Sequence, residues 1–154
     1  MSFDARIEEL GLKLPNAPSP GGTYSPVVVV GNIAYCSGHG PIRAEDNQMI
    51  VGKVGVDLTE QDANHAARVT GLTILATLKQ ELGSLDRIER LVKVLGMVNA
   101  VPDFTQQPQV INGFSDLMVE IFGEAGRAAR SAVGMGSLPG NIPVEIEVIL
   151  KLKD

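Results

Sequence analysis

The sequence is poor in cysteine and has no long apolar run, and each absence excludes a class of protein. Cys36 is the only cysteine, so no internal disulfide can form, as fits a protein of the reducing cytosol. The longest purely apolar run, Val27 to Val30, is far short of the ~20 residues that a membrane helix needs. The first ten residues mix acidic with apolar side chains and do not resemble a signal peptide. We therefore expect a cytoplasmic protein without a membrane partner.

Basic residues are also scarce. Lys and Arg number 13 against 18 Asp and Glu, which gives a formal net charge of −5. Phosphate binding needs a surplus of Lys and Arg on one face, so this balance argues against nucleic acid as a partner. The two histidines, His39 and His65, lie on different predicted elements, and no complete nucleotide-binding glycine loop is found. The sequence therefore implies neither a metal nor a cofactor.

The length and composition are those of one globular domain over residues 1–154. Hydrophobic residues make up 44% of the chain and charged residues 20%. Helix start and stop signals mark three segments, each opened by a serine, threonine or proline and each followed by glycine. The predicted helices are a short one over residues 2–10 and two long ones over 59–82 and 108–122.

Short runs of Val, Ile and Leu predict five strands and a candidate sixth. Two of them, Pro26–Val30 and Ile33–Ser37, are joined by Gly31-Asn32, a two-residue hairpin turn. The other predicted strands are Ile88–Val98, Ser131–Met135 and Val144–Leu152, with Met49–Val56 as a sixth that glycines interrupt.

This order predicts an α+β fold, in which both long helices pack on one face of a five- to six-stranded mixed sheet. Several strands carry apolar residues toward both faces: Val27, Val29, Ile33, Tyr35, Val92, Val94, Ile146 and Val148. No third long helix is available to cover the second face. We therefore expect a homo-oligomer whose sites lie in clefts between subunits.

Arg130 and the acidic pair Glu145 and Glu147 are the main candidates for chemistry. Arg130 opens an apolar run without an acidic residue beside it, and the two glutamates point to the same face of the last strand. On neighbouring strands, a cation and a carboxylate would hold a small anionic substrate together with a water. Taken alone, however, these residues favour a surface ion pair and solvated acids.

Two further residues have competing interpretations. His39 follows a strand in a glycine-rich turn, where a histidine that lines a site would titrate near neutral pH. A structural role for His39 nevertheless ranks first. Cys36 lies inside an apolar strand, where a small buried hydrophobe is the default and a nucleophile the exception.

The C-terminal pattern resembles the signature of the RidA/YjgF family. The matching residues are Ala129-Arg130-Ser131-x-Val133, then Leu138-Pro139, then Val144-Glu145-Ile146-Glu147. Earlier segments resemble the family in the same order: Gly22-Thr23-Tyr24-Ser25-Pro26, Tyr35 to Pro41, Asp103-Phe104 and Val110-Ile111-Asn112. His39 replaces the usual glutamine, Ala132 stands where archetypal members often have cysteine, and residues 1–17 form an N-terminal extension with a short helix. The chain therefore resembles a divergent subgroup.

The resemblance implies a single RidA-like domain of chorismate-mutase-like fold, assembled as a homotrimer with three clefts between subunits. Members with the arginine hydrolyse enamines and imines, such as 2-aminoacrylate, to 2-keto acids and ammonia without metal or cofactor. Arg130 would then grip the substrate carboxylate, and Glu145 would activate the attacking water. The other implied substrate-binding residues are Tyr24, Ser37, Gly38, Asn112 and Ala132, with His39 as a further candidate.

Two alternatives stay open. A non-catalytic trimer that binds small carboxylates or keto acids would keep the arginine as well. An endoribonuclease-like activity ranks low, because the net charge is −5 and no histidine acid–base pair is evident. Arg130 and Glu145 together favour an enzyme, a deaminase of 2-iminobutanoate and 2-iminopropanoate.

Overall fold

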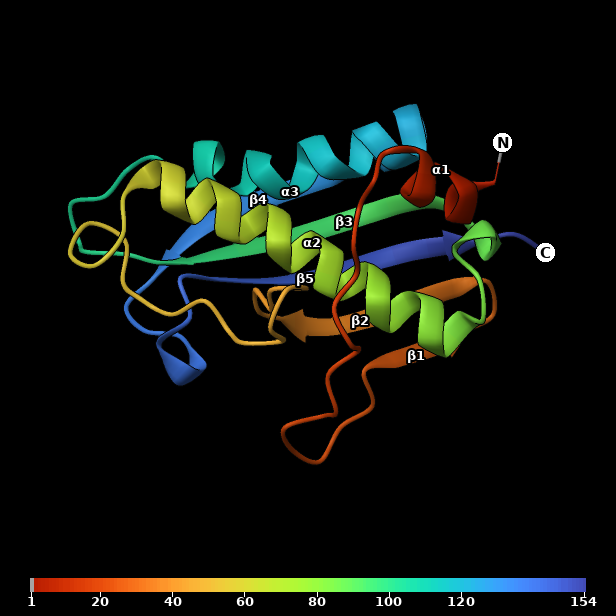
Figure 1. The fold of residues 1–154 in the computed structure, drawn as a ribbon, viewed down its shortest axis with the longest axis horizontal. Helices are drawn as coiled ribbons and strands as arrows, with labels where there is room; N and C mark the ends of the chain where they lie inside the picture. The colour runs from red at the N-terminus through yellow and green to blue at the C-terminus, as the bar shows by residue number, and fades with distance from the viewer. Residues whose placement is uncertain (1) are drawn as a thin grey trace.

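The structure, a computed structural model, describes residues 2–154 as a five-stranded sheet with helices packed on one face (Figure 1). The strand order across the sheet is β1-β2-β5-β3-β4, with β3 and β4 parallel and the other pairs antiparallel. The strands are β1 Val27–Val30, β2 Ile33–His39, β3 Ile88–Asn99, β4 Ala129–Met135 and β5 Val144–Leu152. The helices are α1 Phe3–Glu9, α2 Glu60–Leu82 and α3 Gln107–Phe122, with short 3₁₀ turns at Leu85–Arg87, Gly123–Gly126 and Pro139–Asn141.

All three predicted helices are present, and their first residues show why two of them start where they do. The Ser2 hydroxyl accepts a hydrogen bond from the backbone N–H of Ala5. Thr59 and Asp62 form a reciprocal capping box at the start of α2. Gly83 ends α2 in the left-handed region, at φ 83°, where glycine has no steric penalty.

The five main strands are confirmed, but the candidate sixth strand at Met49–Val56 is wrong. Within residues 2–154 this segment makes isolated bridges instead of a ladder. Gly52 and Gly55 take φ angles of 136° and 95°, which break the extended backbone that continuous pairing requires. Strand β2 also runs two residues further than predicted, to His39.

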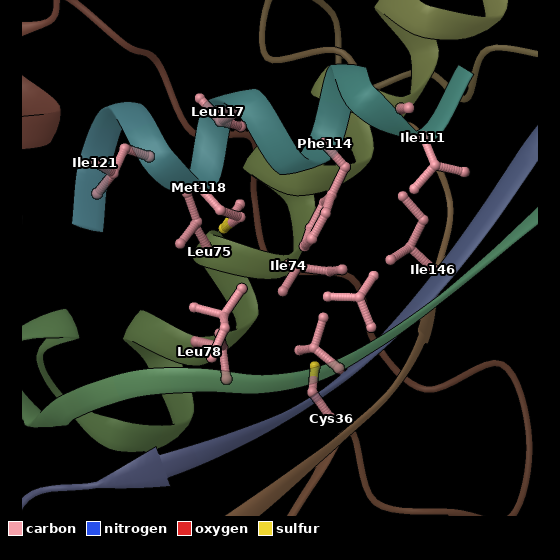
Figure 2. Packing of buried hydrophobic residues seen from close by; sticks show 14 of the residues in the cluster. Cys36, Ile74, Leu75, Leu78, Ile111, Phe114, Leu117, Met118, Ile121 and Ile146 are labelled. Atoms are coloured by element: carbon pink, nitrogen blue, oxygen red, sulfur yellow. The ribbon is translucent and has the colours of Figure 1, made fainter. Parts of the chain in front are cut away.

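The hydrophobic core lies between the sheet and the two long helices (Figure 2). Its largest fully buried side chains include Ile74 and Leu78 from α2, Phe114 and Leu117 from α3, and Ile146 from β5. Burial of each such side chain stabilises the fold by about 1.5–3 kcal/mol. The buried apolar side chains of α2 and α3 therefore hold both helices on the same face of the sheet, as the sequence predicts.

The opposite face of the sheet is covered by no helix in the described part of the chain. Tyr35 and Val133 on it are 48% and 38% exposed, and Ile149 between them is only partly buried. Strand pairing places Tyr35 beside Ile149, which confirms that they share this face. The molecule thus presents an apolar surface that one chain leaves open.

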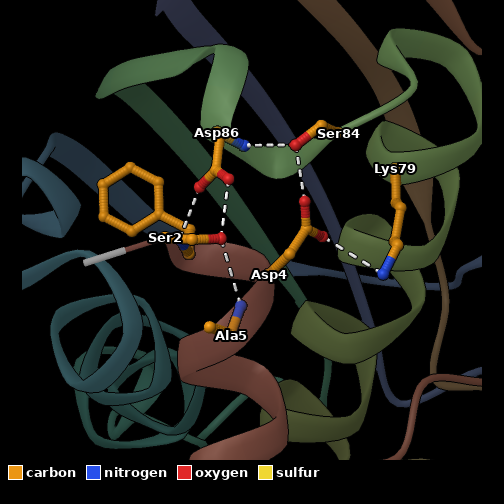
Figure 3. Close-up of polar contacts among 7 residues, drawn as sticks. Ser2, Asp4, Ala5, Lys79, Ser84 and Asp86 are labelled. Atoms are coloured by element: carbon orange, nitrogen blue, oxygen red, sulfur yellow. Dashed lines mark hydrogen bonds and ion pairs between the residues drawn. The ribbon is translucent and has the colours of Figure 1, made fainter.

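The N-terminal helix is docked on the turn that joins α2 to β3 (Figure 3). The Ser2 hydroxyl donates to a carboxylate oxygen of Asp86 at 2.6 Å. Asp4 accepts a hydrogen bond from the Ser84 hydroxyl at 2.5 Å and pairs with Lys79 at 3.1 Å. From α1 the chain continues to the loop before β1, which later contributes to a cavity on the open face.

Gly113 marks a close approach of α3 to α2. A Cβ atom there would lie 2.0 Å from the backbone oxygen of Asn64. Gly113→Ala is expected to destabilise the protein by about 2 kcal/mol or more, because overpacking outweighs the roughly 1 kcal/mol that alanine gains over glycine in a helix. Urea unfolding measures the change. Gly21→Ala is the matched control, since its Cβ meets no atom within 4 Å. Equal midpoints for the two variants would contradict the close contact.

Candidate functional site

The Arg130 side chain extends from the edge strand β4 onto α3. Its Nη1 donates to Asn112 Oδ1 at 2.8 Å and to Ser115 Oγ at 3.1 Å, and its Nη2 lies 3.4 Å from the carbonyl oxygen of Pro108. All three partners are neutral. Among residues 2–154 no carboxylate lies within the 4.0 Å of an ion pair with Arg130, so the surface ion pair favoured by the residues alone is absent. The guanidinium is therefore held in place with its charge unneutralised.

A cavity of about 490 Å³ adjoins this guanidinium, between α3 and the neighbouring strands. Asn112 and Ser115 line it together with two exposed acids, Asp116 and Glu120. Arg68 already holds Glu120 through two hydrogen bonds of 3.0 Å. The cavity thus offers one fixed cation and open space beside it.

Glu145 lines a second, larger cavity of about 820 Å³ on the open face of the sheet. Burial, and to a lesser extent the charge of Glu147, raises the pKa of the half-buried Glu145 carboxyl. Within the described chain no hydrogen bond or ion pair occupies this carboxylate. A carboxylate in this state is suited to accept a proton from a water.

Ser37 and Gly38 form the floor beneath Glu145. The β2–β5 register shifts between Cys36 and His39, which makes Ser37-Gly38 a bulge. A Cβ on Gly38 would lie 2.3 Å from Glu145 Oε2, so only glycine lets the carboxylate occupy this position. Ser37 also ties the bulge to the preceding loop, because its hydroxyl donates to the Ser25 carbonyl at 2.8 Å.

Tyr24 lies in that same loop and lines the cavity of Glu145. It is half exposed, and its hydroxyl oxygen accepts a hydrogen bond from the Gly21 N–H at 3.1 Å. Ala132 lies elsewhere, two residues after Arg130 on β4, where it packs against the core. The structure thus gathers the predicted site residues into two groups, one around Glu145 and one around Arg130.

These two groups lie on opposite faces of the sheet. Strand β3 separates β4 from β5, so Arg130 and Glu145 do not lie on neighbouring strands of one chain. Arg130 pairs with Val94, which is buried under the helices, whereas Glu145 pairs with Met97, three positions further along β3. Side chains an odd number of positions apart on a strand point to opposite faces. A single chain therefore cannot bring both groups to one ligand.

His39 is buried, with 7% of its surface exposed, at the back of the Glu145 cavity. Its two ring nitrogens lie 2.6 Å from the Ser37 carbonyl oxygen and 2.8 Å from the Thr77 hydroxyl. Burial lowers the pKa of His39, and the hydrogen bond to Ser37 only partly opposes this shift. The structural interpretation of His39 is therefore supported over that of a group titrating near neutral pH.

Cys36 is a buried small hydrophobe, as the sequence predicts. Burial and the charge of Glu147 raise the pKa of its thiol to about 12, so the reactive thiolate is suppressed. In the part of the chain that the structure describes, no cluster of His, Cys, Asp and Glu is suited to hold a metal ion. No described helix is long and apolar enough to cross a membrane.

Sequence reasoning missed Ser115, which holds the guanidinium beside Asn112. The signal was available, because residues three apart on a helix lie on the same face. It also missed Thr77, the partner of His39, because a buried threonine in an apolar helix stripe has no distinctive sequence signal.

Comparison with known proteins gives consistent matches over nearly the whole chain. A family model described as "YjgF/chorismate mutase-like, putative endoribonuclease" matches residues 4–148. Protein TCP17 of Trypanosoma cruzi is 38% identical, over 97% of this chain and 94% of its own. A 2-iminobutanoate/2-iminopropanoate deaminase of Dermatophagoides farinae is 30% identical, over 92% of this chain and 95% of its own.

Solved structures match as well. A protein of unknown function from Agrobacterium tumefaciens is 40% identical with a TM-score of 0.87, covering 98% of this chain and 92% of its own. A "putative endoribonuclease" from Shewanella oneidensis is 31% identical with a TM-score of 0.93, covering 99% and 100%. The YjgF gene product of Escherichia coli, 23% identical with a TM-score of 0.64, covers 92% and 98% and shares the fold. The TM-scores of 0.87 and 0.93 exceed the 0.64 of the Escherichia coli protein, as expected if this chain and the first two proteins form a subgroup within one fold.

Proposed function

The chain belongs to the YjgF/chorismate mutase-like family, and from this premise we propose that it hydrolyses enamines and imines of small 2-oxo acids to the 2-oxo acid and ammonia. The observation that carries the proposal is the Arg130 guanidinium, which neutral partners hold beside a cavity. A fixed, unneutralised guanidinium binds a carboxylate through two parallel charge-assisted hydrogen bonds. The relative named as an imine deaminase supports the same reaction class.

In this proposal Arg130 anchors the substrate and Glu145 activates water. Glu145 takes a proton from the water as the water oxygen bonds to the imine carbon, and it passes this proton to the nitrogen to give the carbinolamine. Glu145 then takes the hydroxyl proton and returns it to the amine as the C–N bond breaks, so that ammonia leaves and the carbonyl forms. An enamine enters the same path after it takes up a proton on carbon and becomes the imine. The half-buried position of Glu145 suits it to this exchange of protons.

The remaining predicted residues complete the pocket in this proposal. Tyr24 and Asn112 orient the substrate and its neighbours, and the Ser37-Gly38 bulge offers one backbone carbonyl, that of Gly38, to the substrate nitrogen. Ala132 contributes through its backbone N–H. None of these roles depends on the side chain of Ala132, so the absence of cysteine there is compatible with turnover.

A complete site in this proposal draws on two copies of the chain. Because Arg130 and Glu145 lie on opposite faces, the Arg130 edge of one copy must meet the Glu145 cavity of the next. The exposed apolar face around Tyr35 and Val133 is the surface that such an assembly would bury. Together with the family resemblance, this supports a cyclic homotrimer with one site at each seam.

The test is to generate 2-aminoacrylate in situ and to follow its loss and the release of ammonia. Wild-type protein is expected to accelerate both well above the buffer rate. Decay of 2-aminoacrylate at the buffer rate would contradict the proposed reaction. Retention of the product 2-oxo acid without any acceleration would instead indicate a non-catalytic binder.

A mixing experiment tests whether the site is shared between copies. Arg130→Ala and Glu145→Gln are each expected to be nearly inactive, but a co-refolded equal mixture should regain activity. Random assembly gives about a quarter of the sites both intact residues. Each variant refolded with itself is the control. A mixture no more active than its components would contradict a site built from two chains.

A further inference from the structure

His39 connects the floor of the Glu145 cavity to the interior of the protein. It is the last residue of β2, directly after the Ser37-Gly38 bulge, and its ring is buried against α2. The Ser37 carbonyl oxygen can only accept a hydrogen bond, so Nδ1 carries a proton and donates to it at 2.6 Å. Nε2 of the neutral ring then accepts from the Thr77 hydroxyl at 2.8 Å.

The bulge is consequently held from two sides. On the helix side, Thr77 is 1% exposed and locks the imidazole that binds the Ser37 carbonyl. On the loop side, the Ser37 hydroxyl donates to Ser25 and the Ser37 N–H donates to the Pro26 carbonyl at 2.9 Å. Bulges are otherwise the loosest points of a ladder, because their backbone groups are left unpaired.

The position of Glu145 depends on this bulge. Its Oε2 lies where a Cβ of Gly38 would be only 2.3 Å away, so the carboxylate packs directly on the Gly38 backbone. A movement of Gly38 therefore changes the surface on which the carboxylate packs. No other described residue makes a hydrogen bond or ion pair that would hold the Glu145 side chain.

We propose that His39 is a positioning residue, which fixes the Ser37-Gly38 bulge through the Ser37 carbonyl and thereby sets the place of the Glu145 carboxylate. The consequence for turnover rests on the proposed function, whereas the consequence for Glu145 itself does not. His39 takes no part in proton transfer, because both its nitrogens are occupied and its ring is buried.

The groups that surround His39 leave it neutral. On its own strand, the Cys36 sulfur lies 3.9 Å from Nδ1 and belongs to a protonated thiol. From α2 the neighbour is the uncharged Thr77. From β5 the acids of the shared cavity are Glu145 and Glu147, and neither is bonded to the ring.

The experiment compares His39→Gln with His39→Leu. Glutamine carries a donor and an acceptor on one planar group and can bind both Ser37 and Thr77, whereas leucine fills similar space without either. We expect kcat of His39→Leu to fall roughly 10- to 100-fold with KM within about threefold of wild type, because a misplaced base costs rate while Arg130 still anchors the substrate. His39→Gln should stay within about threefold of wild type in kcat.

A second measurement is independent of turnover. Titration of the Glu145 side-chain carboxyl carbon by NMR should show its pKa falling toward the ordinary value in His39→Leu, as the released carboxylate becomes hydrated, and staying raised in His39→Gln. Thr77→Val should give a smaller shift in the same direction. Thr70→Val is the matched control, because Thr70 is equally buried in α2 but bonds the Ala66 carbonyl.

Each outcome has one meaning. Identical Glu145 titrations in wild type, His39→Gln and His39→Leu would overturn the positioning role, as would equal losses of kcat in both variants. Absence of turnover in the wild type would overturn the proposed function, and the titration would still decide the role of His39. Urea unfolding of each variant identifies any that fails to fold, and Thr77→Val then replaces it.

Discussion

Arg130→Ala is expected to lower kcat/KM for 2-aminoacrylate by roughly 10²–10⁴-fold. The variant loses two charge-assisted hydrogen bonds to the substrate carboxylate, each worth about 1.5–3 kcal/mol, and each 1.4 kcal/mol is a factor of ten. Initial rates of ammonia release over a range of substrate concentrations measure the loss. Its stability should change little, because the side chain is only partly buried and its partners can turn to water.

Two controls make this result specific to the guanidinium. Arg130→Lys keeps the charge without the planar fork, so we expect only partial recovery. Arg127→Ala removes an equal charge from the same cavity rim, but Arg127 pairs with Glu124 at 3.3 Å and is largely exposed. Its kcat/KM should remain within about threefold of wild type, since an exposed pair contributes little. Equal losses in Arg127→Ala and Arg130→Ala would indicate a general charge effect and contradict the carboxylate anchor.

Glu145→Gln is expected to lower kcat by roughly 10²–10⁴-fold, the range typical of a lost general base, with a smaller change in KM. In the wild type the base must be ionised, so activity should fall as the pH drops through the pKa of Glu145. That pKa is raised by burial, which places the acidic limb above the ordinary range of a glutamate. The residual rate of Glu145→Gln should lack this limb. A variant with an unchanged pH profile would exclude Glu145 as the base.

Glu147→Gln is the matched control for Glu145. Both acids point to the open face of the sheet. The charge of Glu147 adds to the effect of burial in raising the pKa of Glu145. Its removal lowers the pKa of Glu145, so the acidic limb should move to lower pH while the maximal kcat is largely kept. A shift to higher pH would show that the two carboxylates do not interact in this way.

The fold was predictable where local chemistry determines it. Thr59 with Asp62 and Gly83 define both ends of α2, and the two-residue Gly31-Asn32 turn defines the first hairpin, so each signal lies within a few residues of its effect. The prediction of a strand at Met49–Val56 is wrong because the segment has the apolar residues typical of a strand without its backbone conformation. Gly52 and Gly55 adopt backbone angles there that a residue-type pattern does not reveal.

The arrangement of the candidate site was not predictable, because it depends on pairing between distant strands. Strands β4 and β5 follow one another in the chain, yet β3 lies between them, since the α3 crossover returns the chain parallel to β3. The faces of Arg130 and Glu145 follow only once their partners, Val94 and Met97, are known. The candidate residues could therefore be identified from the sequence, but their positions on opposite faces of the sheet could not.

This register has a consequence for how the chain can change in length. One residue inserted in β4 before Arg130 would turn the guanidinium to the face of Glu145, and a second would turn it back, roughly 7 Å along the strand. The Gly136–Pro143 connection carries no such alternation, but it lines the Glu145 cavity and buries Ile142, so contacts constrain its length instead. Within β4, even a single insertion or deletion would move the side chains on one side of it to the opposite face of the sheet.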